Sequence, residues 1–501
     1  MLETIKTVND TLNGLIWGWP ALALLAFVGV LMTVQTGFFQ VTHFGYWMKH
    51  TIGAIFHEEH ITQHTKDRTI SQFQSLCTAL AATVGTGNIV GVAGAIAVGG
   101  PGAVFWMILI AFFGMMTNYS ENVLGILYRR KNEDGEWCGG AMYYLESGLG
   151  AKKGMKGVGK ALAVLFSLFC AVASFGIGNM SQVNSMVTNV HTAFGIPNIV
   201  TGIFLFAAVS AVIIGGLKRV AAFTERLVPF MVLLYLAGAM VIVLLHISVI
   251  PAAFVSIFKG AFAMKSAAGG VVGAGIASAM KMGMKRGVFS NEAGLGSSVM
   301  VHSSSNVREP VRQGMWGIFE VFADTIVVCT LTSLVILTSG VINLETGMMT
   351  AEAEAVGSSS LVSLAFSNTF GKAGAAFIAV AILLFAYSTV LGWSHYGSKA
   401  FEYLFGTKAI FGYRVVFALV VIAGSVVEAK LAWEISDTFN GMMMLPNLIG
   451  VLILSPQVHN CTSNYVRRKI HGETNLKPLL SMIPEIQEAQ EASLAEAGGE
   501  D

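Results

Sequence analysis

Long apolar stretches separated by short polar breaks run through most of the chain. Each stretch is roughly 20 residues long, which is the length that a helix needs to cross a hydrocarbon core of about 30 Å. The pattern predicts an all-α membrane protein with about eleven spanning helices, over residues 15–34, 72–97, 102–127, 161–190, 196–215, 227–248, 271–300, 313–339, 372–396, 411–429 and 435–456.

The composition supports this interpretation. Of the 501 residues, 54% are hydrophobic and only 12% are charged, and the net charge is +1. Water-soluble domains carry about twice that charged fraction, and a nearly neutral chain offers no basic surface to a nucleic acid. The phosphate-binding motif GxxxxGK[ST] is absent, so we expect neither an ATP-driven pump nor an enzyme.

Lysine and arginine gather in alternate loops. When the loops are assigned in turn to the two sides of the membrane, one side receives most of the basic residues, including Arg129, Arg130 and Lys131 and the later Arg467 and Arg468. Basic loops stay in the cytoplasm. We therefore expect a multi-pass protein of the cell membrane with its N-terminus outside and its C-terminus in the cytoplasm.

The number of helices suggests an internal repeat. If the first helix is peripheral, the other ten form two groups of five, and because five is odd the second group is inverted. We expect a peripheral helix and first cytoplasmic loop over 1–70, a first repeat over 71–250, an inverted repeat over 251–456 and a cytoplasmic tail over 457–501. The acidic tail beyond about residue 475 is expected to be disordered or weakly helical.

Two predicted helices carry polar, glycine-rich interruptions in corresponding places. ATVGTGN (82–88) interrupts the first helix of one repeat, and SNEAGLG (290–296) interrupts the first helix of the other. Unwound backbone inside a membrane is tolerated only where protein or a water-filled cavity satisfies its amides and carbonyls. Close helix packing would explain the glycines but not the polar side chains beside them. The paired interruptions therefore predict a binding site near the middle of the membrane.

Such a site suits a zwitterionic amino acid, which needs donors for its carboxylate and acceptors for its ammonium. The amides of Thr86 and Gly87 open a half-helix and can donate to a carboxylate. Asn88 offers an amide group for either end of the substrate. In the second interruption, the candidate contacts for the ammonium are the side chains and freed carbonyls of Ser290, Asn291 and Gly294.

Acidic residues in the apolar stretches have several open roles. Glu292 is a candidate ligand for an ammonium or a cation, a candidate proton carrier, or an ion-pair partner of an earlier basic residue, namely Lys281, Lys285 or Arg286. Glu320 and Asp324 are one helical turn apart and either line a water path or form structural ion pairs.

A group of hydroxyls lies in the stretch 372–396. Ser388 and Thr389 can complete an oxygen shell around a small hard cation, or they can bond back to the preceding turn. Trp393 shares a helix face with Thr389. In the fourth stretch, Phe175 and Gln182 are two turns apart and either line a pocket or only pack.

These motifs resemble the alanine or glycine:cation symporter family over nearly the whole chain. The motifs are ATVGTGN (82–88), GGPGAVFWM (99–107), GGAMYYLESGLG (139–150), KRGVFSNEAGLGS (285–297) and STVLGW (388–393). One position departs from the family pattern, because Ile108 stands where the family has Trp. The resemblance implies a leucine-transporter-like fold with a 5+5 inverted repeat and one extra N-terminal helix.

The resemblance also implies the cargo and its ligands. The expected substrate is alanine or glycine, and the expected coupling ion is sodium. The sodium would lie between the carbonyls of Ala81 and Val84 and the hydroxyls of Ser388 and Thr389. By alternating access, the site would open first to the outside and then to the cytoplasm, which would move both across the membrane. Phe175 and Trp393 would form pocket walls that limit the size of the substrate's side chain.

Two other functions remain open at this point. A proton-coupled amino-acid carrier would use one of the buried acids, whereas a channel for ions or small solutes would show no saturable coupling. The expected partners are a small amino acid and the lipid bilayer, with no nucleic acid. The sequence does not indicate an oligomeric state.

Overall fold

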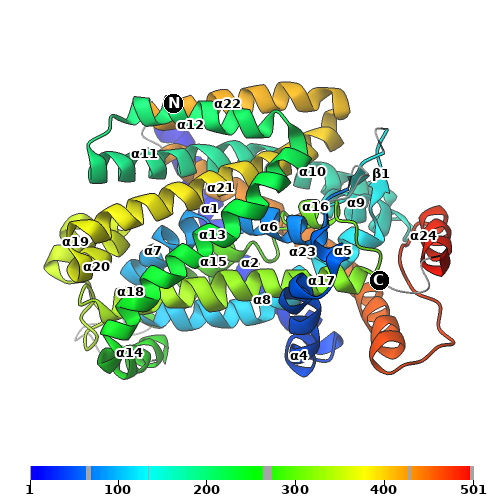
Figure 1. The fold of residues 1–501 in the computed structure, drawn as a ribbon, viewed down its shortest axis with the longest axis horizontal. Helices are drawn as coiled ribbons and strands as arrows, with labels where there is room; N and C mark the ends of the chain where they lie inside the picture. The colour runs from blue at the N-terminus through cyan, green and yellow to red at the C-terminus, as the bar shows by residue number, and fades with distance from the viewer. Residues whose placement is uncertain (1, 64–68, 134, 263–273, 427–429, 497–501) are drawn as a thin grey trace.

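The computed structural model describes residues 2–63, 69–133, 135–262, 274–426 and 430–496, and nearly all of their regular structure is helical. In lipid every backbone amide must find a partner within the protein, which a helix achieves within its own segment. Several long helices run roughly along the longest axis of the molecule (Figure 1). The hairpin and the C-terminal helix lie at one end of that axis, opposite the two short helices of residues 351–370.

The long helices and their broken pairs follow the predicted order. They are α1 (Leu2–Ile16) and α2 (Trp19–Gln35), α6 (Gln72–Thr83) and α7 (Val90–Gly99), α8 (Gly102–Leu127), α10 (Lys156–Phe175) and α11 (Ser181–Phe194), α12 (Asn198–Ile213), α13 (Gly216–Leu245), α15 (Ala274–Asn291) and α16 (Val299–His302), α17 (Pro310–Val321) and α18 (Thr330–Thr338), α21 (Lys372–Phe405), α22 (Ile410–Val426) and α23 (Lys430–Tyr465).

Shorter elements connect them. The short helices are α3 (Phe39–Thr42), α4 (Phe44–Met48), α5 (Glu59–Thr62), α9 (Ala141–Tyr143), α14 (Ile250–Phe262), α19 (Ala351–Val356), α20 (Leu361–Phe370) and α24 (Pro484–Glu496). Wider π-helical turns join α10 to α11 as η5 (Gly176–Met180) and α17 to α18 as η7 (Phe322–Cys329). Strands β1 (Arg130–Lys131) and β2 (Trp137–Cys138) form an antiparallel hairpin.

The prediction of an all-α membrane protein is confirmed. Within the described ranges, eight helices are long and apolar enough to cross a membrane, and the bent pair α6 and α7 makes a ninth. The predicted stretch 196–215 is the 16-residue helix α12. The stretch 271–300 divides into α15 and α16, and residues 271–273 lie outside the described part of the chain. The total of eleven spans stays a prediction.

Two ends of the chain differ from expectation. Helix α23 passes through Pro446 and Pro456 and continues to Tyr465, beyond the predicted start of the tail. Of the two forms expected for the tail, disordered or weakly helical, the structure has a helix over residues 484–496, which form α24. The segment before α24 is anchored, because the Met482 amide donates to the Leu127 carbonyl at 2.9 Å and Leu480 is buried.

The broken helices lie inside the bundle. Helix α8 packs against α15 and α17, while α21 packs against α6, α10 and α11. Small residues permit the closest approach. A Cβ placed on Gly283 of α15 would lie 2.3 Å from the Ala103 carbonyl oxygen of α8, so only glycine fits there. The two interruptions are thus held against rigid neighbours.

Candidate functional site

The first interruption leaves backbone groups free for a ligand. Helix α6 ends at Thr83, and the chain bends by 57° before α7. The Gly85 amide, which would continue the helical ladder to Ala81, donates instead to the Asn88 side chain at 2.9 Å. Among the described residues, the amides of Thr86 and Gly87 donate to no protein acceptor. Buried amides of this kind need a partner, so the interruption offers two donors to an anion.

The second interruption follows α15 and is held by its own side chains. Glu292, Gly294 and Gly296 have φ angles of 56°, 91° and 71°, which a right-handed helix cannot accommodate. Asn291 accepts a hydrogen bond from the Ala293 amide at 3.0 Å and donates to Thr325 Oγ1 at 3.0 Å. Both ends of the Asn291 amide are therefore engaged in shaping the turn.

The two interruptions meet at a buried carboxylate. Asp324, in η7, accepts hydrogen bonds from Asn88 Nδ2 at 2.6 Å and from Ser290 Oγ at 2.9 Å. Thr325 Oγ1 donates a third bond at 2.7 Å, and Asp324 is fully buried. A Cβ placed on Gly87 would lie 3.4 Å from the Ser290 Cα. One side chain thus holds the first unwound segment against the last turn of α15, where the second interruption begins.

Helix α21 closes another side of the first interruption. A Cβ placed on Gly85 would lie 2.3 Å from the Thr389 hydroxyl oxygen, and one placed on Gly392 would lie 2.9 Å from the Ala82 Cα. The hydroxyls of Ser388 and Thr389 donate to the Phe385 carbonyl at 2.8 and 3.0 Å. Because each hydroxyl donates its hydrogen to the helix backbone, the lone pairs of its oxygen remain available to a cation.

A third wall comes from the helix pair α10 and α11. Thr86 Oγ1 donates to Gln182 Oε1 at 3.0 Å, and the Gln182 amide nitrogen donates in turn to the Ile177 carbonyl at 3.1 Å. A Cβ placed on Gly178 would lie 2.4 Å from the Trp393 Cβ, so the indole of Trp393 packs directly on the widened turn η5. Trp393 is 2% exposed.

Two residues predicted to contact the substrate, Phe175 and Gly294, face other parts of the bundle. The Phe175 ring faces α22, with its centroid 5.2 Å from that of Tyr413. The wide turn η5 follows Phe175 and shifts the helical register, so Gln182 reaches Thr86 while Phe175 points away. Gly294 lies against Leu25, and its carbonyl accepts from Asn447 Nδ2 at 2.9 Å.

The acidic residues have distinct surroundings. Within the described part of the chain, Glu292 forms no ion pair with Lys281, Lys285 or Arg286, and Lys285 lies 2.6 Å from Asp437 of α23 instead. Glu292 instead accepts from Ser297 Oγ at 2.5 Å. Glu320 forms the structural pair that the sequence left open, since His302 Nε2 lies 3.0 Å from its carboxylate.

Sequence reasoning missed the position of Asp324. The pattern suggested a water path or an ion pair for this residue, whereas the structure places it between the two interruptions. The sequence did carry one signal, which was the position of Asp324 deep within an apolar stretch. A carboxylate in the middle of an apolar stretch is costly, and two predicted polar interruptions were the nearest groups able to satisfy it.

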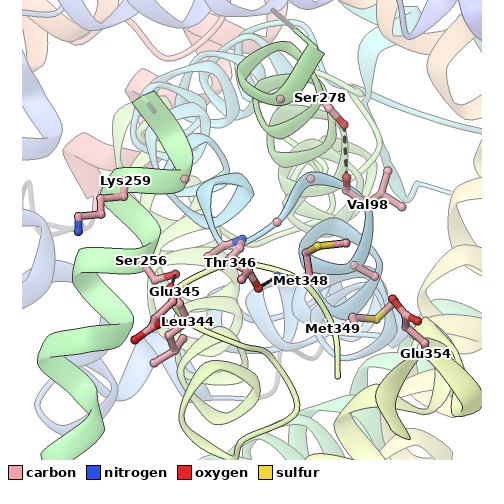
Figure 2. Close-up of a pocket in the computed structure, with 17 residues that line it drawn as sticks. Val98, Ser256, Lys259, Ser278, Leu344, Glu345, Thr346, Met348, Met349 and Glu354 are labelled. Atoms are coloured by element: carbon pink, nitrogen blue, oxygen red, sulfur yellow. Dashed lines mark hydrogen bonds between the residues drawn. The ribbon is translucent and has the colours of Figure 1, made fainter. Parts of the chain in front are cut away.

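A separate cavity of about 390 Å³ lies at the far end of α7. Figure 2 shows Lys259, Glu345 and Glu354 around it, with Ser278 donating to the Val98 carbonyl at 3.4 Å. Helix α7 has ten residues, so it is about 15 Å long. The cavity is therefore a mouth at the end of the bundle, distinct from the site around Asp324.

Known proteins are similar to this chain in fold and in sequence. A Na⁺-coupled sialic acid symporter matches with a TM-score of 0.50 at 12% identity, covering 96% of this chain and 97% of that one. The sodium/alanine symporter AgcS of Methanococcus maripaludis is 43% identical over 454 residues, which is 91% of this chain and 95% of AgcS.

Further matches agree. The probable sodium/glutamine symporter GlnT of Bacillus subtilis is 34% identical over 475 residues, covering 94% of this chain and 93% of GlnT. Residues 2–478 match the model of the sodium:alanine symporter family. AgcS and GlnT are named as symporters, so the family is one of transporters rather than enzymes. The sequence matches confirm the resemblance, and the sialic acid symporter supports the leucine-transporter-like fold. The chain belongs to the sodium:alanine symporter family.

Proposed function

We propose that the protein carries a small neutral amino acid, alanine or glycine, into the cell together with sodium, by alternating access. The observation that carries the proposal is the meeting of the two interruptions at Asp324. It brings unpaired backbone donors and polar side chains together inside an apolar bundle. The name of AgcS, a sodium/alanine symporter, supports sodium as the coupling ion and alanine as the substrate.

The substrate would lie between the two interruptions. Its carboxylate would accept from the free amides of Thr86 and Gly87, with the positive end of the following half-helix behind it. Its ammonium would face the second interruption at Ser290. Asn88 and Asn291 would position the backbone rather than bind the substrate, because their side chains are already engaged. Gln182 orients Thr86, and Trp393 would limit the size of the side chain.

The sodium would lie where α21 crosses the end of α6. The interruption frees the Ala81 carbonyl from the Gly85 amide, and Val84 is the last residue before the bend. The oxygens of Ser388 and Thr389 face this point from α21. Four neutral oxygens suit a hard monovalent cation. One charge moving inward gains about 2.3 kcal/mol per 100 mV, which is enough to drive accumulation.

Uptake of labelled alanine into proteoliposomes tests this proposal. At fixed pH, an inward sodium gradient should drive accumulation, whereas an equal potassium gradient should not. A third arm imposes a pH gradient without sodium. Uptake in that arm alone would favour the proton-coupled rival, which rests on the buried carboxylates of Asp324 and Glu292. Currents far above carrier turnover would instead indicate a channel.

Competition then ranks the substrates. Because GlnT is a probable sodium/glutamine symporter, a larger side chain is a reasonable competitor. We expect unlabelled alanine and glycine to inhibit uptake more strongly than glutamine, since the Trp393 indole fills the space beside the interruption. Stronger inhibition by glutamine would overturn the assignment of small substrates but leave sodium coupling intact.

We also propose that the mouth in Figure 2 faces the outside. All five native cysteines are buried, so a single introduced cysteine can report on sidedness. A membrane-impermeant maleimide added to intact cells should label Ser278→Cys. Lys152→Cys, on an exposed residue in a loop with several lysines, should react only after the membrane is permeabilised. The reverse pattern would invert the proposed orientation.

A further inference from the structure

A large basic cavity lies at the end of the molecule opposite that mouth. Its volume is about 1010 Å³, and it opens between the β1–β2 hairpin, residues 306–308 and α24. Figure 1 shows β1 and α24 together at this end. Among the described residues that line the cavity, four are basic, namely Arg129, Arg130, Lys131 and Arg308, and one is acidic, Glu485. The cavity therefore carries an excess of positive charge.

Arg129 forms a fixed wall of the cavity. Its guanidinium donates to the carbonyls of Ser303 and Ser305 at 3.3 and 2.8 Å and also to the Val307 carbonyl. It stacks 4.3 Å above the Trp137 ring. These contacts lock the loop after α16 against the end of α8, so the cavity has a preformed shape.

Arg130 and Arg308 each have guanidinium N–H groups that donate to no acceptor in the described structure. Arg130 donates to Ser147 Oγ at 3.1 Å, while its nearest carboxylate, Glu146, is 3.9 Å away and takes a closer contact from Lys160 at 3.0 Å. The Arg130 Nε is buried and has no hydrogen-bond partner in the described structure. Arg308 is half-buried in the lining, and no ion pair or hydrogen bond occupies its guanidinium within the described part of the chain.

The other walls of the cavity are apolar and lie near the end of a spanning helix. Ile483, Ile486 and Ala489 line one side, opposite Trp137. The adjoining Met482 amide bonds to Leu127, the last residue of the membrane-scale helix α8. A basic cavity with an apolar wall at the end of a spanning helix has the features of a headgroup site. Guanidinium groups favour phosphate because they present paired donors to its oxygens.

We propose that this cavity binds a phosphate-bearing anion, held by Arg130 and Arg308, with Lys131 adding charge at the rim. The same chemistry is offered by the headgroup of an anionic phospholipid and by a soluble phosphate compound. The site is separate from the interruptions around Asp324, so the proposal stands or falls independently of the transported substrate.

Thermal unfolding of the purified full-length protein tests the site. One arm compares nanodiscs of phosphatidylcholine with nanodiscs that also contain phosphatidylglycerol, and another adds pyrophosphate to the phosphatidylcholine nanodiscs. The wild-type midpoint should rise by at least about 2 °C in one of these arms. The Arg308→Gln variant should weaken the response, and Arg130→Gln with Arg308→Gln should reduce the apparent affinity at least tenfold.

The matched control is Lys152→Gln with Lys153→Gln, which removes the same charge from exposed residues that do not line the cavity. It should respond like the wild type. A response to phosphatidylglycerol alone identifies a lipid ligand, and a response to pyrophosphate identifies a soluble one. The proposal is overturned if no arm shifts the midpoint, or if the double arginine variant and the lysine control respond alike.

Discussion

Replacing Asp324 with alanine should reduce sodium-driven alanine uptake by at least 100-fold. The change leaves Asn88, Ser290 and Thr325 without their shared acceptor. Each buried donor left unpaired costs about 1–3 kcal/mol, so the two interruptions would lose the contact that aligns them. Initial rates in proteoliposomes, normalised to folded protein by size-exclusion chromatography, measure the effect.

Asp324→Asn separates geometry from charge. The amide keeps the volume, but its NH₂ group would face hydroxyl and amide donors, so an intermediate loss of roughly tenfold is expected. Glu352→Gln, on an exposed residue of α19 that does not line the mouth, is the control for removing a carboxylate and should leave uptake unchanged. Uptake within twofold of the wild type for correctly folded Asp324→Ala would remove Asp324 from the site.

Replacing Gly85 with alanine should raise the sodium concentration for half-maximal uptake by more than tenfold. The added methyl would lie 2.3 Å from the Thr389 hydroxyl oxygen, so either α21 or the interruption must move. A sodium held between carbonyls of α6 and hydroxyls of α21 would then lose its geometry. Sodium titrations of alanine uptake at saturating alanine give the half-maximal concentration directly.

Gly94→Ala is the matched control, because a Cβ at Gly94 of α7 would meet nothing within 4 Å and alanine favours a helix. It should behave like the wild type. Thr389→Ala keeps Gly85 and removes the hydroxyl together with the γ-methyl group, so it should also raise the half-maximal sodium concentration. If Gly85→Ala and Thr389→Ala both left sodium dependence unchanged, the proposed sodium site would be wrong.

The sequence predicts the helices well because lipid imposes one length and one periodicity. The stretch 102–127 coincides with α8, and each of the other predicted stretches contains a helix. The ends are less predictable. Helix α13 begins at Gly216, well before the predicted start at 227, because a helix continues past the apolar stretch into polar residues. Short helices such as α14 and α19 lie outside the spanning pattern.

The site was only partly predictable, since polar interruptions show in the sequence but side-chain direction does not. The pairing of the segments around Gly87 and Ser290 followed from their corresponding positions. The divergence of Phe175 and Gln182 depends on the wide turn η5, which an ideal helical spacing does not reveal. Lys285 pairs with Asp437 instead of Glu292 because of how α15 and α23 pack, and the sequence alone does not reveal that long-range packing.

The three carbonyls captured by Arg129 have a consequence for biosynthesis. Arg129 and Ser305 are 176 positions apart, so the ribosome synthesises Arg129 long before the loop after α16 exists. Until that loop has been synthesised, Arg129 lacks these three carbonyl acceptors. We therefore expect the loop after α16 to reach its final conformation only after residues up to Val307 have been inserted, as a late step in assembly.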